Sequence, residues 1–179
     1  SNKTLGVIGA GRIGTAFALK SKGFDMDVLY VDHSHNEKLE ETLDAKKVDL
    51  DELVKKSDFI SIHVPLTDET HHMITEKHFK MMKETAVIIN TSRGPVINEK
   101  TLIKALKKGW IFSAGLDVYE NEPEVPNALK QLDNVVLLPH IGSASFETRS
   151  KMAEMAAENM LKGLKGGKPP NCVNEKVFS

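Results

Sequence analysis

Short apolar runs alternate with helix-like segments along almost the whole chain. The runs are rich in β-branched residues and nearly continuous in apolar character, which is typical of parallel strands covered on both faces. They occupy residues 5–9, 27–32, 58–64, 86–92, 113–118 and 134–140. Because helical patterns separate them, their order predicts repeated βαβ units and a single α/β domain with a doubly wound parallel sheet.

The segments between the runs have the spacing of amphipathic helices. In the segment that starts at Arg12, Ile13 and Phe17 fall on one face, and Gly23 has the position of a helix-ending residue. The sequence GGKPPN ends the last helical pattern, because its prolines cannot continue a helix. The other predicted helices occupy residues 49–56, 75–83, 98–109 and 145–164.

Composition narrows the class of protein. The chain has 179 residues, 24 basic and 25 acidic, and a formal net charge of −1. This balance gives no electrostatic argument for nucleic acid or an anionic membrane as partner, and no apolar run has membrane-spanning length. A single cysteine, Cys172, excludes an internal disulfide framework and favours a reducing compartment, the cytoplasm.

Three glycines follow the first predicted strand in the spacing G-x-G-x-x-G. Gly9 permits a tight turn, Gly11 lets a pyrophosphate approach the backbone, and Gly14 lets the next helix pack closely on the sheet. The N-terminus of that helix directs N–H groups and a positive dipole end toward phosphates. A strand before the loop and a helix after it indicate a Rossmann-type dinucleotide site. The plainer alternative is a turn whose glycines serve packing alone.

An aspartate marks the end of the second predicted strand. Asp32 lies 18 residues beyond Gly14, where a carboxylate accepts hydrogen bonds from ribose hydroxyls and repels a 2′-phosphate. The next three residues, His33 to His35, include neither arginine nor lysine. The sequence therefore favours NAD over NADP.

Three polar residues follow three different predicted strands. Arg93, Glu122 and His140 are 29 and 18 residues apart, and in a parallel sheet all three lie at the carboxyl edge, where ligands bind. An arginine binds a carboxylate with two hydrogen bonds, a histidine transfers a proton to or from a carbonyl oxygen, and a neighbouring carboxylate stabilises the imidazolium. The same residues are equally consistent with a surface arginine, a loop glutamate and a strand-capping histidine.

Five motifs in order resemble one family. GVIGAGRIG, HVPLT, NTSRGPVI, GLDVYENEP and LPHIGSAS look like the coenzyme domain of the D-isomer-specific 2-hydroxyacid dehydrogenases. The resemblance covers residues 3–174. Within the family, the glyoxylate and hydroxypyruvate reductase branch is the most similar. The alternative is phosphoglycerate dehydrogenase, for which the substrate would be 3-phosphoglycerate. Glu122 argues against formate dehydrogenase, which resembles this family but has glutamine at the matching position.

The resemblance implies a role for each matching residue. Arg93 would orient a 2-oxo acid, His140 would act as acid/base and Glu122 would pair with it, so that hydride from NADH yields a D-2-hydroxy acid. The cofactor would be NAD, and no metal is expected. Beside the three glycines and Asp32, the matching cofactor-binding residues are Arg12, Ile13, Val64, Pro65, Thr70, Thr91, Asp117 and Gly142.

The resemblance also sets expectations for the rest of the molecule. Residues 3–168 would form the NAD-binding domain, and residues 169–179 would cross toward a substrate domain that this chain lacks. NAD(H) binding with little turnover is therefore expected, together with a possible homodimer through the coenzyme domain. An NAD-responsive interaction module of the corepressor type is the alternative function.

Two adjacent histidines invite a different interpretation. His71 and His72 lie next to each other, which is not the ligand spacing of a zinc site. We interpret them as part of a solvated loop.

Overall fold

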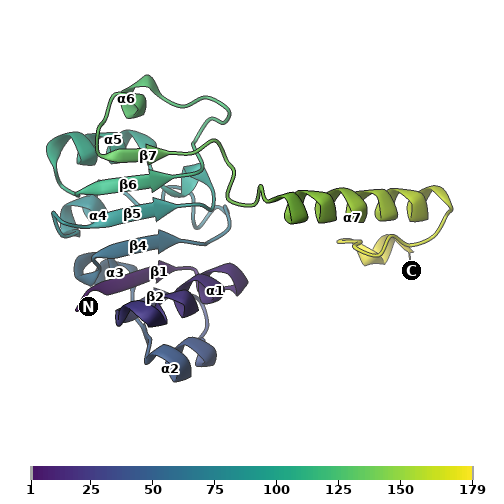
Figure 1. Cartoon of the computed structure of the whole chain (residues 1–179), viewed down its shortest axis with the longest axis horizontal. Helices are drawn as coiled ribbons and strands as arrows, with labels where there is room; N and C mark the ends of the chain where they lie inside the picture. Colours follow the sequence, from purple (N-terminus) through teal and green to yellow (C-terminus); the bar gives the residue numbers. More distant parts are fainter. Residues whose placement is uncertain (1, 179) are drawn as a thin grey trace. The chain divides into compact units, whose positions relative to one another are not determined.

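The computed structural model describes residues 2–178 and contains two compact units, one that ends at His140 and one that starts at Ile141. Figure 1 shows the chain coloured from its N-terminus to its C-terminus.

The first unit is built on one parallel sheet. Its strand order is β3-β2-β1-β4-β5-β6-β7, and every neighbouring pair is parallel. This arrangement confirms the predicted Rossmann-type doubly wound sheet. The strands are β1 (Thr4–Ile8), β2 (Asp27–Val31), β3 (Lys46–Lys47), β4 (Phe59–Ile62), β5 (Val87–Asn90), β6 (Ser113–Leu116) and β7 (Val135–Leu137).

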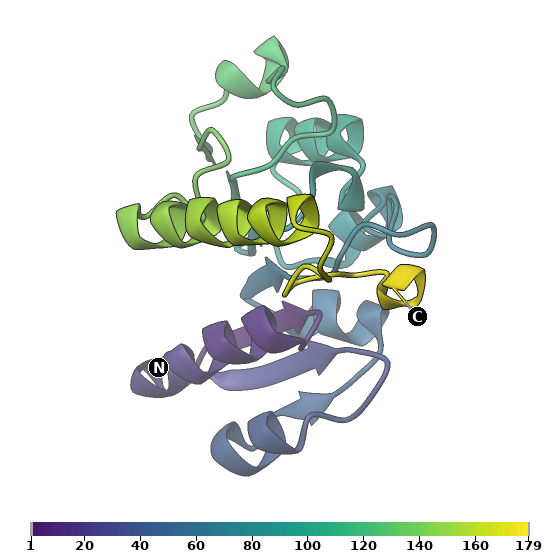
Figure 2. The ribbon, with the colours of Figure 1, turned by 90° about the vertical axis from the view of Figure 1, so that its right-hand side faces the viewer.

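Helices cover both faces of this sheet (Figure 2). On one face α1 contacts α2, and on the other α3 contacts α4 and α4 contacts α5. The helices are α1 (Arg12–Lys20), α2 (Glu37–Leu43), α3 (Leu50–Lys56), α4 (Glu76–Met81), α5 (Glu99–Lys108) and α6 (Asn127–Lys130), with 3₁₀ turns η1 (Ser21–Phe24) and η2 (Gly94–Val96).

A buried apolar cluster lies on each face of the sheet, and the side chains of β1 alternate between the two clusters. Leu5 and Val7 are buried in the cluster under α1 and α2, whereas Ile8 belongs to the larger cluster under α3, α4 and α5. Gly6 points toward α3, where a Cβ atom would lie 2.6 Å from the Leu53 side chain. The absence of a side chain at Gly6 therefore allows α3 to approach the sheet closely.

Some local predictions were wrong or incomplete. Gly23 does not end α1: the helix stops at Lys20, a 3₁₀ turn follows, and Asp25 takes the left-handed backbone conformation with φ 49°. The helices α2 and α6 and the strand β3 were not predicted. Strand β3 consists of two lysines at the sheet edge, so it carries no apolar pattern that a sequence analysis could detect.

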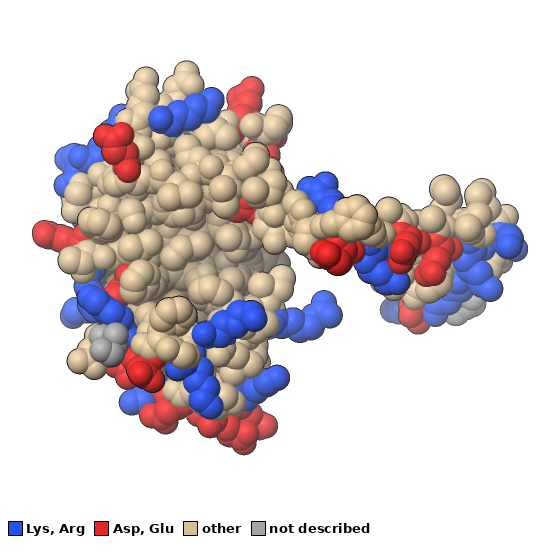
Figure 3. Space-filling model, viewed as in Figure 1, with Lys and Arg blue, Asp and Glu red and all other residues tan. Residues whose placement is uncertain are grey.

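One part of the sheet lacks helical cover within the described residues of the first unit. The strand register places Phe59, Ile89 and Val136 on the same face of the sheet as Val7. On this face α1 packs against Val7. Val136 and Phe59 are exposed. Figure 3 shows a broad surface with few charged side chains in this region.

The second unit consists mainly of one helix, α7 (Phe146–Leu164), and ends in the 3₁₀ turn η3 (Glu175–Phe178). Ser145 caps α7, because its Oγ accepts a hydrogen bond from the Thr148 N–H at 3.2 Å. The returning chain is held by the Asn171 N–H, which donates to Oδ1 of Asn159 at 3.0 Å. Among the described residues, no helix combines the length and the apolar character needed to cross a bilayer.

Candidate active site

The glycine loop joins β1 to α1 at the carboxyl edge of the sheet. Gly9 has φ 92°, and a Cβ atom there would lie 2.8 Å from the backbone nitrogen of Val64. A Cβ atom at Gly14 would lie 2.0 Å from the carbonyl oxygen of Gly9, whereas one at Gly11 would meet no atom within 4 Å. Gly9 and Gly14 therefore serve packing, and Gly11 keeps the backbone open toward the cavity.

Asp32 follows β2 and is bonded to the same loop. Its Oδ2 accepts a hydrogen bond from the Ala10 N–H at 2.7 Å, and its Oδ1 accepts one from the His33 N–H at 2.7 Å. Nδ2 of Asn36 donates to the Ala10 carbonyl oxygen at 2.8 Å. A carboxylate has about four lone-pair positions, so Asp32 can accept further bonds from a ribose while bracing the loop.

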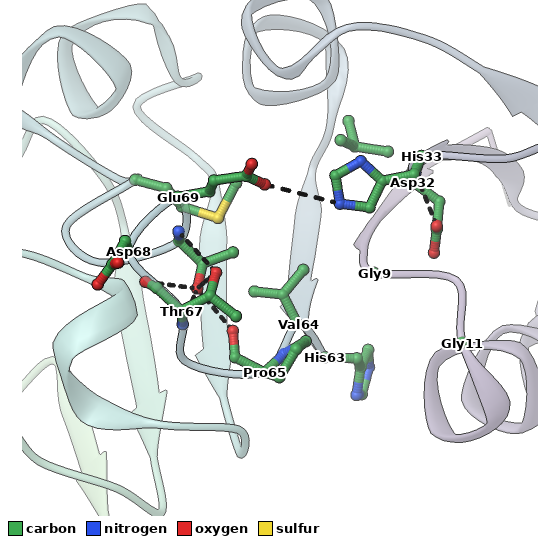
Figure 4. Close-up of a pocket in the computed structure, with 13 residues that line it drawn as sticks. Gly9, Gly11, Asp32, His33, His63, Val64, Pro65, Thr67, Asp68 and Glu69 are labelled. Carbon is green, nitrogen blue, oxygen red and sulfur yellow. Dashed lines mark hydrogen bonds and ion pairs between the residues drawn. The ribbon is translucent and has the colours of Figure 1, made fainter.

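A cavity of about 720 Å³ opens between the glycine loop and the residues that follow β4 (Figure 4). Six of its lining residues were predicted from the sequence, namely Gly9, Gly11, Asp32, Val64, Pro65 and Thr70. The other lining residues are Val31, His33, His63, Thr67, Asp68, Glu69 and Met73. Apart from His63, whose place before Val64 and Pro65 indicated that it could face the cleft, they were not predicted from the sequence.

A turn after β4 forms one rim of this cavity. Thr70 Oγ1 donates to the Pro65 carbonyl oxygen at 2.6 Å and accepts from the Thr67 N–H at 2.8 Å. Across the cavity His33 Nε2 lies 4.0 Å from Glu69 Oε2 (Figure 4). Both side chains are almost fully exposed, so this pair contributes little to stability. The polar run Thr67 to Thr70 was the signal in the sequence for a turn at this rim.

His63 lies at the base of the cavity. Its Nε2 is 2.9 Å from Ser61 Oγ, and its ring centroid is 5.1 Å from that of Phe17. Burial lowers the pKa of His63, because desolvation disfavours the charged imidazolium. A neutral histidine here packs against Phe17 of α1 without adding charge to the cavity.

Glu122 and His140 form a direct pair in the first unit. His140 Nδ1 lies 2.7 Å from Glu122 Oε2, and the two side chains are 49% and 34% exposed for His140 and Glu122 respectively. The other carboxylate oxygen, Oε1, accepts a hydrogen bond from the Tyr119 N–H at 3.1 Å. Tyr119 also donates from its hydroxyl to the Leu138 carbonyl oxygen at 2.8 Å, so one residue contacts both the glutamate and the segment that leads to His140.

Burial would raise the pKa of Glu122, but other interactions outweigh it. Hydrogen bonds from His140 and from the Tyr119 N–H, together with the charges of His140 and Arg93, hold this pKa below its usual value. Glu122 is therefore an anion at neutral pH and is suited to orient an imidazole and stabilise its protonated form.

Arg93 follows β5 at the same edge of the sheet. Its side chain is exposed, and Nη1 donates to the Ser92 carbonyl oxygen at 2.6 Å. The buried Asn90 side chain fixes the turn, since Nδ2 donates to the Arg93 carbonyl oxygen at 3.0 Å and Oδ1 accepts from the Ser92 N–H at 3.0 Å. Asn90 was not among the predicted site residues, although its place at the end of an apolar run is visible in the sequence.

The remaining predicted residues have varied positions. Arg12 and Ile13 are exposed in the first turn of α1, and Thr91 is exposed directly after β5. Asp117 is buried after β6, where its N–H donates to the Asn90 carbonyl oxygen at 3.0 Å. Gly142 belongs to the second unit.

The prediction of a solvated loop was wrong for His72. The rings of His71 and His72 stack with centroids 4.0 Å apart, and His72 Nε2 lies 2.6 Å from Glu120 Oε1. Within the described residues no group of histidine, cysteine and carboxylate side chains has the arrangement of a metal site.

Comparison with known proteins gives one consistent family. The model of the D-isomer specific 2-hydroxyacid dehydrogenase NAD binding domain matches residues 1–142. Glyoxylate reductase of Korarchaeum cryptofilum is 54% identical over 176 residues, which are 98% of this chain and 53% of that protein. Glyoxylate reductase of Thermococcus litoralis is 54% identical over 177 residues, which are 99% of this chain and 54% of that protein.

A solved structure agrees with these relatives. The NAD-complexed D-isomer specific 2-hydroxyacid dehydrogenase of Lactobacillus delbrueckii ssp. bulgaricus has a TM-score of 0.83 and 33% identity, over 96% of this chain and 56% of that chain. This chain thus spans about half the length of the relatives that it matches.

Proposed function

The chain belongs to the D-isomer specific 2-hydroxyacid dehydrogenase family, and on that premise we propose that it is the NAD-binding part of an oxidoreductase that reduces a small 2-oxo acid to a D-2-hydroxy acid. The observation that carries the proposal is the Glu122–His140 pair at 2.7 Å, on the sheet edge that also bears the glycine loop. The names of the relatives favour an enzyme over an NAD-responsive interaction module.

The cavity fits a dinucleotide by its chemistry. Gly11 leaves the backbone open where a pyrophosphate would approach the N-terminus of α1. Asp32 would bind the adenosine ribose, and the apolar Val64 and Pro65 would contact the adenosine part. We assign Arg12, Ile13, Gly14, Thr70, Thr91, Asp117 and Gly142 to the same cofactor.

Arg93, Glu122 and His140 have different roles toward the substrate. When bound, NADH supplies the hydride. Arg93 binds and orients the carboxylate of the 2-oxo acid, and protonated His140 donates its proton from Nε2 to the carbonyl oxygen as that oxygen gains negative charge. Glu122 holds His140 Nδ1 and stabilises the imidazolium before transfer.

The test uses NADH fluorescence for binding and NADH absorbance for turnover, with glyoxylate and then hydroxypyruvate. We expect the 179-residue chain to bind NADH and to oxidise it slowly. A chimaera that adds the segments which the Korarchaeum relative has outside the match should oxidise NADH rapidly when glyoxylate is added. A chain that does not bind NADH, or a chimaera without glyoxylate-dependent oxidation, would contradict the proposal.

Replacing Asp32 by alanine should weaken NADH binding and narrow its advantage over NADPH, because a carboxylate that binds ribose hydroxyls also repels a 2′-phosphate. Asp32→Asn is the matched control, since the amide keeps an acceptor for the Ala10 N–H but has no charge. Both variants are titrated with NADH and NADPH. An unchanged ratio of the two dissociation constants in both variants would remove Asp32 from cofactor selection.

The family resemblance also implies domain bounds and an oligomeric state for this chain, which we propose as follows. We propose residues 3–168 as the NAD-binding domain and residues 169–179 as a crossing segment toward a substrate domain.

The exposed apolar sheet face around Val136 and Phe59 supports a homodimer, because apolar patches of this kind mark protein interfaces. The single cysteine supports a cytoplasmic location, and hydroxypyruvate stays a second candidate substrate.

A further inference from the structure

A second carboxylate–histidine cluster includes Glu120, which lies on the same loop after β6 as Glu122. Glu120 Oε1 is 2.6 Å from His72 Nε2 and accepts a hydrogen bond from the Glu99 N–H at 3.0 Å. The Glu120 N–H in turn lies 3.4 Å from Oε2 of Glu99, and Asn98 Nδ2 is 3.4 Å from His72 Nδ1. The side chains of His72 and Glu120 are only 33% and 20% exposed, and Glu99 is 8% exposed.

This cluster joins three segments that are far apart in the sequence. His72 belongs to the connection between β4 and α4, Glu99 is the first residue of α5, and Glu120 lies in the loop that follows β6. Glu120 thus receives an N–H group from the N-terminus of α5, where the helix dipole favours a negative charge. One carboxylate fixes the loop after β6 to two other elements.

The same loop carries the catalytic glutamate. Tyr119, the neighbour of Glu120, donates its N–H to Glu122 and its hydroxyl to the Leu138 carbonyl oxygen. Gly94, the neighbour of Arg93, packs on this loop so closely that a Cβ atom there would lie 1.9 Å from the Tyr119 carbonyl carbon. The position of the loop therefore sets the positions of Glu122 and of the turn that carries Arg93.

We propose that Glu120 is a positioning residue, held by His72 and Glu99, that fixes the loop after β6 so that Glu122 stays aligned with His140 and Arg93. The catalytic meaning of this alignment rests on the proposed function, whereas the alignment itself is a property of the chain without cofactor or substrate.

Burial makes the cluster sensitive to its own charges. Burial raises the pKa of Glu99, the Glu120 N–H lowers it, and the charge of Glu120 raises it again, so that the net shift is upward. His72 offers Glu120 a donor, and the backbone N–H groups of Glu99 and Glu120 are each directed at the carboxylate of the other residue. Each carboxylate therefore has hydrogen-bond donors that offset the cost of its burial.

The experiment measures the pKa of the Glu122 carboxyl group by ¹³C NMR in the full 179-residue chain. In Glu120→Ala we expect this pKa to rise toward its ordinary value, because the loop no longer holds the Tyr119 N–H and His140 against the carboxylate. Removal of a nearby negative charge alone would lower the pKa of Glu122. The sign of the change thus distinguishes positioning from simple electrostatics.

Two further variants complete the comparison. Glu120→Gln keeps an acceptor oxygen for the Glu99 N–H, so it should restore the pKa of Glu122 to the wild-type value or slightly below it. Glu124→Ala is the matched control, because it removes the same charge from the same loop. Glu124 is exposed, and among the described residues no hydrogen bond or ion pair joins its side chain to His72 or Glu99. It should not raise the pKa of Glu122.

An unchanged or lowered pKa of Glu122 in a folded Glu120→Ala variant overturns the proposal. If that variant does not fold, His72→Asn replaces it, since asparagine tolerates the left-handed conformation of His72, with φ 50°. The pKa of Glu122 should then rise by a smaller amount, and no rise overturns the proposal. Because the readout needs neither NADH nor turnover, failure of the proposed function would appear separately, as a chain that does not bind NADH.

Discussion

Replacing His140 by alanine should reduce glyoxylate-dependent NADH oxidation by about 10²–10⁴-fold, which is the range of contributions from a positioned general acid. The reason is that Glu122 contacts a ring whose other nitrogen is the proposed proton donor, and no other histidine is paired with Glu122 among the described residues. NADH binding should remain within about twofold, because His140 does not line the cofactor cavity. We therefore expect kcat to fall, whereas the affinity for NADH stays nearly unchanged.

The assay compares the chimaera described above with its His140→Ala and His140→Asn variants. Asparagine keeps the left-handed backbone that His140 adopts, with φ 55°, so it separates lost chemistry from a strained loop. His35→Ala is the control, since His35 is another exposed histidine paired with a glutamate, Glu40, at 2.8 Å. Turnover that survives in both His140 variants would place the proton donor elsewhere.

The sheet was predictable because its strands, apart from the two-residue β3, coincide with nearly continuous apolar runs. Parallel strands share one carboxyl edge, so Arg93, Glu122 and His140 were expected together although 47 residues separate the first from the last. The direct contact between Glu122 and His140 followed from the family resemblance and not from spacing. Helix α2 was missed because its seven residues follow a run of polar residues, and only Leu39 of this helix is buried.

The contacts between the loops that carry Arg93 and Glu122 were not predictable from local pattern. Glu120 and His72 are 48 residues apart, and each by itself resembles a solvated loop residue. The close packing of Gly94 on Tyr119 depends on where two strands end in space. A local stretch of sequence indicates the secondary structure and the burial of its own residues. A hydrogen bond between two distant loops depends instead on how the whole sheet is assembled.

Substituting alanine for Gly11 and for Gly14 should separate two functions of the glycine loop. Gly14→Ala should lower the free energy of unfolding by about 3 kcal/mol, the upper part of the range for overpacking. Its Cβ atom would lie 2.0 Å from the carbonyl oxygen of Gly9, a backbone atom that cannot move without displacing the loop. NADH binding should be lost with it, because the N-terminus of α1 would shift away from the phosphates.

Gly11→Ala should have the opposite profile. Gly11 has φ −70°, which alanine adopts readily, and no atom lies within 4 Å of the added methyl group. Its free energy of unfolding should therefore change by less than about 1 kcal/mol. NADH affinity should fall at least about tenfold, or about 1.4 kcal/mol, because the methyl group would occupy the space through which a pyrophosphate approaches the loop. Urea unfolding and NADH fluorescence titration of both variants measure the two effects. A Gly11→Ala variant that binds NADH as tightly as the wild type would show that the pyrophosphate does not lie against this loop.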